Sequence, residues 1–242
     1  MPNWVTNIMK FTGDKTSIEN LFAAVRTENS DFSFEKIIPM PKTLNLPQSS
    51  SSSMFIAFYL NSLPEVKRKD ILDELAGNKQ TESHVRDYFH DKDSVSEENL
   101  LSVCKCYDNE QYYFAYGDTP ADVGKQYVEN LLVYKHATWY GWSCEHWGTK
   151  WDACGASANP KSNEIRFTTA WSRASDEILL KLSEMFPETR FTYHYADEDF
   201  GSNVGALAFF NGTKVFEDRP ISGSKEAIRL AGSILGREYE ED

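Results

Sequence analysis

The segment from Trp139 to Asp152 concentrates side chains that could do chemistry. It holds four of the six tryptophans of the chain. Each indole offers a large apolar area and one N–H donor, and a lysine between two tryptophans can lie over a ring as a cation–π pair. Two explanations fit the pattern: the tryptophans pack the helical insertion onto the sheet, or they line a groove that binds a ligand or partner. The candidate binding residues are Trp142, Trp147, Lys150, Trp151, Asp152 and Trp171.

The same segment supports a second, enzymatic hypothesis. Cys144, His146, Lys150 and Asp152 are ionisable groups among aromatic residues, a setting in which pKa values shift. They would serve an enzyme, or a ligand-binding protein, for a small polar molecule. However, the sequence contains no G-x-S-x-G, P-loop or G-x-G-x-x-G motif. We therefore favour a non-catalytic protein and expect no cofactor.

Metal-binding patterns are also missing from the sequence. The five histidines form no H-x-x-x-H pair, and the spacing of Cys104, Cys106, Cys144 and Cys154 fits no zinc site. His194 precedes Asp197, Glu198 and Asp199, but the spacing of a calcium loop is absent. We expect the four thiols to be free, and we expect no metal site.

The charge balance limits the class of partner. Against 25 lysines and arginines the chain has 37 aspartates and glutamates, which gives a net charge of −12. Binding to nucleic acid depends on Lys and Arg, so we expect a protein partner instead. Acidic residues at 197–199, 217–218 and 238–242 suggest a third hypothesis, a decoy that imitates nucleic acid.

The hydropathy of the chain indicates its compartment. No apolar run approaches the ~20 residues of a membrane span, and the first residues lack the pattern of a secretory signal. We expect a cytoplasmic protein with no membrane association.

The first forty residues predict a strand, a helix and a strand. Residues 4–12 are rich in β-branched and aromatic types, and Asp14 or Thr16 can cap a helix with apolar residues at helical spacing. A second strand is expected at 32–38, ending before Pro39. This βαβ unit predicts a right-handed crossover between parallel strands.

The following hundred residues differ in character. Apolar residues at intervals of three and four predict helices at 54–62, 64–76, 81–90 and 96–106. Thr119 and Pro120 are a capping residue and a first-turn proline, so a further helix should run to about residue 135. These elements predict a mainly helical insertion.

The remaining residues return to strands. Residues 152–158 and 164–170 flank a turn-rich connector and predict a hairpin. Ser175 should cap a helix that Pro187 ends. Strands are expected at 191–196, 204–210 and 214–217, and a short helix at 223–235.

Without the insertion, the element order predicts an α+β fold. It fits a ferredoxin-like, split βαβ sheet layer with helices on one face. The expected parts are residues 1–41 for the first half of this domain, 42–137 for the insertion, and 138–242 for the tryptophan-rich connector, the second half and an acidic tail.

Four short motifs resemble the YubB ferredoxin-like domain family. They are Pro2-Asn3-Trp4 with Asn7, the stretch 34–41 (FEKIIPMP), the run 147–152 (WGTKWD) and the run 167–172 (FTTAWS). The similarity spans both ends of the chain and skips most of 42–130. In that family prolines commonly follow the last motif, whereas Arg173 and Ala174 stand there in this chain.

The resemblance implies a ferredoxin-like fold and an origin in phages, conjugative plasmids or bacterial genomes. It implies no activity, because the family has none assigned. Together with the tryptophan cluster, it leads to the hypothesis of a mobile-element protein that acts as a non-catalytic interaction module.

Overall fold

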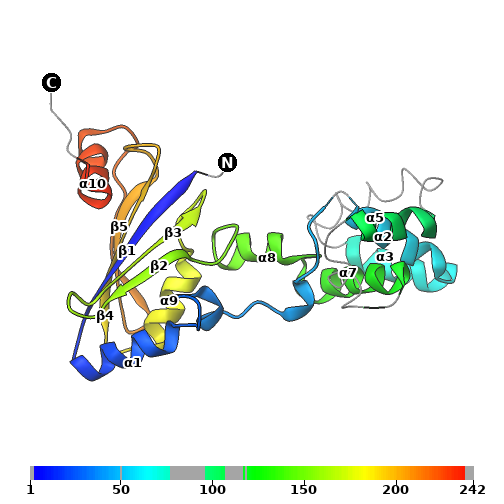
Figure 1. Cartoon of the computed structure of the whole chain (residues 1–242), viewed down its shortest axis with the longest axis horizontal. Helices are drawn as coiled ribbons and strands as arrows, with labels where there is room; N and C mark the ends of the chain where they lie inside the picture. Colours follow the sequence, from blue (N-terminus) through cyan, green and yellow to red (C-terminus); the bar gives the residue numbers. More distant parts are fainter. Residues whose placement is uncertain (1–2, 50, 77–95, 107–116, 118, 238–242) are drawn as a thin grey trace. The chain divides into compact units, whose positions relative to one another are not determined.

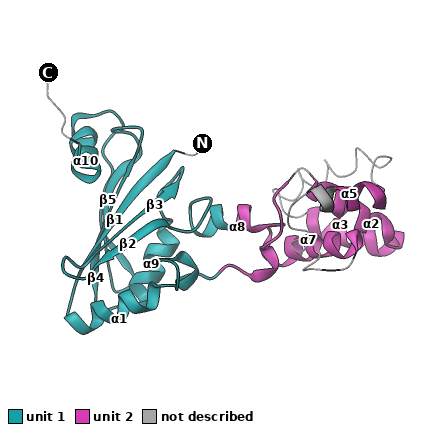
Figure 2. Cartoon of the chain, in the orientation of Figure 1, with its two compact units in different colours: residues 1–39, 143–242 teal, residues 40–142 magenta. Residues whose placement is uncertain are grey.

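The computed structural model describes residues 3–49, 51–76, 96–106, 117 and 119–237. The chain divides into two compact units (Figure 2). Unit 1 comprises residues 1–39 and 143–242, and unit 2 comprises residues 40–142. Within the described ranges, no helix is both long and apolar enough to cross a membrane.

Unit 1 is built on a six-stranded antiparallel sheet (Figure 1). Its strands are β1 (Trp4–Thr12), β2 (Cys154–Asn159), β3 (Glu164–Ala170), β4 (Arg190–Asp197), β5 (Val204–Phe210) and β6 (Thr213–Asp218). The strand order is β2-β3-β1-β4-β5-β6. The first four strands of this order have the split βαβ arrangement, and β5 and β6 extend it. The predicted ferredoxin-like α+β fold is confirmed.

One face of the sheet carries the main core of unit 1. Val5, Met9 and Phe11 alternate along β1 and are buried, as the two-residue period of a strand requires. Helices α1 (Lys15–Val25) and α9 (Asp176–Met185) lie on this face. The ring centroids of Phe11 and Phe22 of α1 are 5.6 Å apart.

The opposite face is covered in part by α10 (Lys225–Leu235). Ala227, Ala231 and Ile234 of this helix form a buried cluster with Ile8 and with residues of β4 and β5. The expectation that all helices lie on one face is therefore wrong for α10. Ile8 is an apolar residue on the outer face of β1, so a third helix is needed to bury it.

The predicted strand at 32–38 and its parallel crossover are also wrong. Residues 34–36 form the short 3-10 helix η1 (Phe34–Lys36), and the second strand of the split unit is β2. β1 lies between β3 and β4 and pairs antiparallel with both. The helical insertion therefore falls between α1 and β2, rather than between the second and third strands.

Burial explains why residues 32–38 resemble a strand. Phe32 and Phe34 are fully buried, and Phe32 stacks on Phe167 of β3 with ring centroids 4.8 Å apart. The backbone N–H of Phe34 donates to the side chain of Asp152 instead of to a neighbouring strand. The alternation of Phe32 and Phe34 therefore reflects the packing of their rings against the sheet, and it does not mark a strand.

Unit 2 is helical among its described residues. Its helices are α2 (Ser52–Ser62), α3 (Glu65–Ala76), α5 (Glu97–Cys106), α7 (Pro120–Tyr134) and the start of α8 (Trp139–His146), with the 3-10 helix η2 (Lys42–Leu44). The predicted helix at 81–90 lies outside the described residues. Gly124 of α7 meets α2 so closely that a Cβ there would lie 2.0 Å from the carbonyl oxygen of Phe55.

Local signals at the helix starts are confirmed. Thr119 and Asp122 form a reciprocal capping box ahead of α7, and the Ser175 side chain accepts from the Ile178 N–H at the start of α9. Ser224 caps α10 in the same way. These bonds occupy backbone donors that would otherwise lack partners at a helix N-terminus.

Candidate functional site

Trp147 follows α8 and belongs to the core of unit 1. Its side chain is only 4% exposed, its indole N–H donates to the Ile38 carbonyl at 3.0 Å, and its ring lies 6.0 Å from that of Phe34. A buried tryptophan with its single donor satisfied is a packing element. Trp147 is therefore not accessible to a ligand.

The turn after Trp147 ties this segment to the end of β3 and to α9. Gly148 adopts a left-handed φ of 76°, and a Cβ there would lie 2.8 Å from the Ser175 nitrogen. The Thr149 hydroxyl exchanges hydrogen bonds with the backbone of Ala170 at 2.9 and 3.0 Å. Lys150 and Trp151 are thereby held beside the residue that follows β3.

Four residues from three segments form what we call the aromatic ledge: Trp4, Lys150, Trp151 and Trp171. The Lys150 ammonium lies 4.5 Å from the centroid of the Trp151 ring and 5.0 Å from that of Trp171. The rings of Trp4 and Trp151 are 6.2 Å apart. These distances lie in the range of attractive cation–π and aromatic contacts.

Trp171 is the exposed member of the aromatic ledge. It is 45% exposed and has a φ of 68°, in the left-handed region that bulky residues rarely adopt. Its backbone N–H donates to the Asn3 carbonyl at 2.7 Å. The surrounding structure thus maintains an unfavourable backbone conformation that presents an indole to solvent, and strained residues of this kind cluster at functional sites.

Asp152 has a structural role. Its carboxylate accepts from the Ser33 hydroxyl at 2.5 Å, the Phe34 N–H at 2.6 Å and the Ala153 N–H at 2.7 Å. Burial raises the pKa of Asp152, although these hydrogen bonds oppose the shift. The side chain anchors η1 instead of facing a ligand.

The structure therefore separates the predicted binding residues. It brings Lys150, Trp151 and Trp171 together, and it adds Trp4, which sequence reasoning did not include. Trp142 lies in unit 2 and is 5% exposed. The alternation of buried and exposed residues along β1 could have suggested Trp4, because it is an aromatic residue on the face of that strand that points away from the core.

The residues of the enzymatic hypothesis have different surroundings. His146 lies 3.1 Å from the Glu177 carboxylate, the Lys150 ammonium lies over the tryptophans, and Asp152 anchors η1. Cys144 is exposed, but neighbouring groups desolvate its thiol and raise its pKa, and the charge of Lys150 acts in the opposite direction. A thiol with a raised pKa is a poor nucleophile, so this set gives the enzymatic hypothesis no support.

The acidic residues near His194, which sequence reasoning considered and did not favour as cation ligands, also have other roles. His194 pairs with Ile8 and Asp197 pairs with Val5, so the two side chains point to opposite faces of the sheet. The Asp197 carboxylate accepts from the Asp199 N–H at 2.9 Å and from Asn203 at 3.2 Å. Across the residues that the structure describes, no group of three His, Cys, Asp or Glu side chains could hold a metal ion.

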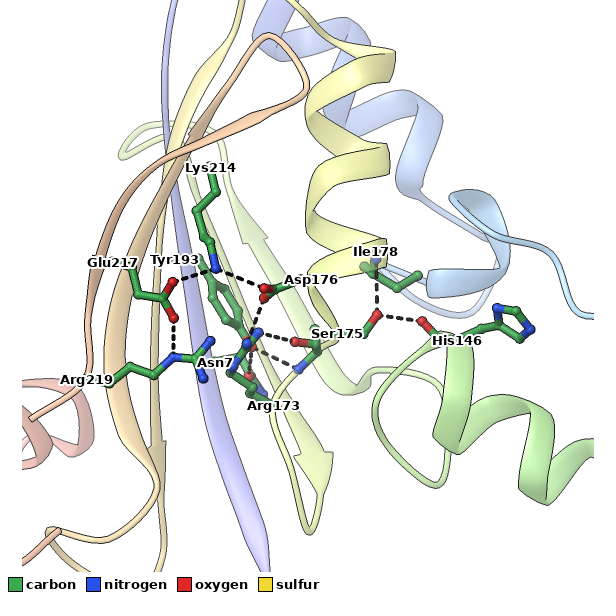
Figure 3. Close-up of polar contacts among 11 residues, drawn as sticks. Asn7, His146, Arg173, Ser175, Asp176, Ile178, Tyr193, Lys214, Glu217 and Arg219 are labelled. Atoms are coloured by element: carbon green, nitrogen blue, oxygen red, sulfur yellow. Dashed lines mark hydrogen bonds and ion pairs between the residues drawn. The ribbon is translucent and has the colours of Figure 1, made fainter. Parts of the chain in front are cut away.

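A buried polar cluster, which sequence reasoning missed, lies under α9 (Figure 3). The Tyr193 hydroxyl donates to the Asn7 side-chain oxygen at 2.5 Å and accepts from the Ala174 N–H at 3.0 Å. The Asn7 amide donates to Val5 and Thr169, both at 2.9 Å. Burial raises the pKa of Tyr193, so its hydroxyl keeps its proton. The sequence signal that could have indicated this cluster is Asn7, a polar residue at a core-facing position of strand β1.

A chain of ion pairs joins the start of α9 to β6 (Figure 3). Asp176 accepts from Arg173 at 2.7 Å and from Lys214 at 3.0 Å. Lys214 also pairs with Glu217, and Glu217 with Arg219, each at 2.5 Å. Arg173 stands where prolines were expected from the family resemblance, and it therefore contributes a charged contact at this corner.

This chain of ion pairs predicts an acid-sensitive contribution to stability. Burial alone would raise the pKa of Asp176, but hydrogen bonds from Arg173 and Lys214 outweigh burial and hold that pKa below its ordinary value of 3.8. The stabilisation from ionised Asp176 is complete above pH 3.8 and is lost as the pH falls through the lowered folded pKa. Chemical unfolding of the wild type and Asp176→Asn should differ at pH 7 and converge in acid. A constant difference would contradict this assignment.

The strand order and the site can now be compared with known proteins. Residues 146–235 match the family model described as the ferredoxin-like domain in Api92-like protein. This match supports the predicted resemblance to a ferredoxin-like family of unknown function. It does not support the name YubB, because the matching model is described by the name Api92. It covers Trp147, Lys150, Trp151 and Trp171, and it leaves out β1 with Trp4.

Among solved structures, the chain is similar to the crystal structure of a protein api92 from Yersinia pseudotuberculosis. The sequence identity is 13% and the TM-score is 0.44, and the comparison covers 93% of this chain and 100% of that chain. No curated protein matched the sequence.

Proposed function

We propose that this chain is a non-catalytic binding module whose contact surface for a partner protein is the aromatic ledge. The observation that carries the proposal is Trp171, an exposed indole in a left-handed backbone conformation with a lysine ammonium 5.0 Å from its ring centroid. Nearly half of the surface of this residue stays exposed although its backbone is held in an unfavourable conformation, and burial in the core requires neither feature.

The physical properties of the aromatic ledge suit protein recognition. Tryptophan is enriched among the residues that dominate binding free energy at interfaces. The Lys150 ammonium contacts both Trp151 and Trp171, which restricts the rotamers of all three side chains before binding. Such preorganisation reduces the entropy that binding must overcome. The lysine also supplies a positive charge for a carboxylate of the partner.

A phage or plasmid origin and a cytoplasmic location belong to the same proposal. The YubB-like motifs at 147–152 and 167–172 support the phage or plasmid origin. Genes of phage or plasmid function on both sides of the coding sequence would support the origin. Recovery of the protein in the periplasmic fraction of a bacterial host would contradict the location.

The proposal is tested with Trp171→Gly. Glycine adopts positive φ without strain, so this variant removes the indole and keeps the turn. In a quantitative pull-down from bacterial lysate, a specific partner should be captured by the wild type and lost with Trp171→Gly. With the purified partner, the variant should bind at least about tenfold more weakly, since removing a hot-spot side chain costs ~2 kcal/mol or more and ~1.4 kcal/mol is already tenfold.

The matched control is Val133→Ala. Val133 is a 67% exposed apolar residue of unit 2, outside the aromatic ledge, and its replacement should leave capture and affinity unchanged. If the partner binds Trp171→Gly as tightly as the wild type, the aromatic ledge is not the contact surface. A retained small molecule without any protein partner would instead favour the ligand-binding alternative.

A further inference from the structure

Among the described strands, β6 forms one edge of the sheet and carries exposed apolar side chains. It is the last strand in the order of the sheet, and Val215 and Phe216 are 47% and 51% exposed. Phe210 of the neighbouring β5, paired with Thr213, is 43% exposed. An edge with unpaired backbone groups and apolar side chains is a template for another strand.

The sequence of β6 is complementary to itself in antiparallel order. Lys214, Val215, Phe216 and Glu217 read positive, apolar, apolar, negative. When two copies of this strand pair about a two-fold axis between Val215 and Phe216, Lys214 of each copy lies opposite Glu217 of the other. The two apolar residues then lie opposite each other at the centre, and directly opposed side chains are the pairs that stabilise a sheet.

The observed register places both charged residues on the same face. Lys214 pairs with Phe209 and Glu217 pairs with Leu207, and residues two apart on β5 share a face. The intervening β-bulge, in which Val215 is the extra residue of β6, makes this possible. Figure 3 shows the two side chains converging on the same side of the strand. Both charges can therefore meet their counterparts across a two-fold axis.

We propose that β6 pairs antiparallel with β6 of a second copy of this chain, which forms a symmetric dimer with a continuous sheet. The charge order argues for a second copy over an unrelated strand, because the complement of this edge is present in the edge itself. Closed two-fold pairs are the commonest arrangement of identical subunits. The bulge and Lys214 are features that discourage indiscriminate edge pairing, so a partner needs the matching charges.

The test uses Lys214→Glu and Glu217→Lys in sedimentation velocity experiments. The wild type should shift from monomer to dimer over a concentration range of about a hundredfold, as mass action requires. Each variant alone places like charges opposite each other twice per dimer, and its dissociation constant should rise at least about tenfold. An equimolar mixture of the two variants should restore a 1:1 dimer, because every cross-strand pair is then of opposite charge.

The mixture separates this proposal from effects within one chain. Lys214 also pairs with Asp176 and Glu217 of its own chain, and mixing two variants cannot restore those contacts. Circular dichroism and thermal unfolding of each variant establish that it is folded. A wild type that stays monomeric throughout, or a mixture that fails to dimerise while both variants are folded, would overturn the proposal.

Discussion

Replacing Trp147 with alanine is expected to lower the free energy of unfolding by about 3–5 kcal/mol, the range for removing a large aromatic side chain from a core. Trp147 is 4% exposed and contacts the ring of Phe34. The substitution also leaves the Ile38 carbonyl without the indole N–H that it accepts. Denaturant unfolding followed by circular dichroism measures this loss as a lower midpoint.

The control for this substitution is Trp171→Gly. Trp171 is 45% exposed and has a φ of 68°, so removing its ring loses less buried surface than removing that of Trp147, and glycine relieves the backbone strain. We expect its free energy of unfolding to fall by about 1 kcal/mol, well short of the loss for Trp147→Ala. If the two tryptophans cost equal amounts of stability, the division between a core tryptophan and an exposed one is wrong.

Replacing Asn7 with leucine is expected to cost about 2–4 kcal/mol, although leucine has a similar size and is apolar. The Tyr193 hydroxyl would lose its acceptor and the Thr169 hydroxyl would lose its donor, and both residues are fully buried. Each buried polar group without a partner costs about 1–3 kcal/mol. Thermal and denaturant unfolding measure the effect.

The double variant Asn7→Leu with Tyr193→Phe tests the cause of this loss. Phenylalanine has no hydroxyl to leave unpaired, so the double variant should be destabilised by less than the sum of the two single changes. We expect a coupling of about 1 kcal/mol or more between these directly bonded residues. Additive costs would show that the Tyr193 to Asn7 hydrogen bond is not the source of the loss.

The sequence by itself determined the elements whose signals are local. The bounds of β1, Trp4–Thr12, agree with the predicted strand, because alternation and β-branched residues act within the segment itself. Helices α7 and α9 begin where their capping residues, Thr119 and Ser175, predicted. The alternation of strands and helices outside the insertion then sufficed for the ferredoxin-like class, although the strand expected at 32–38 is a 3-10 helix, because few sheet topologies accommodate such an alternation.

Where the conformation of a segment depends on residues far away in the chain, only the tertiary structure decided it. Phe32 and Phe34 alternate as in a strand, but Asp152, more than a hundred residues away, bonds the backbone there and leaves it outside the sheet. Within the tryptophan-rich segment Trp142 and Trp147 are buried, whereas Trp151 lies with Trp4 and Trp171 on the aromatic ledge. Burial depends on which distant segments cover a residue. The sequence placed the indoles close together along the chain, and the packing of β1, β3 and α9 decided which of them meets solvent.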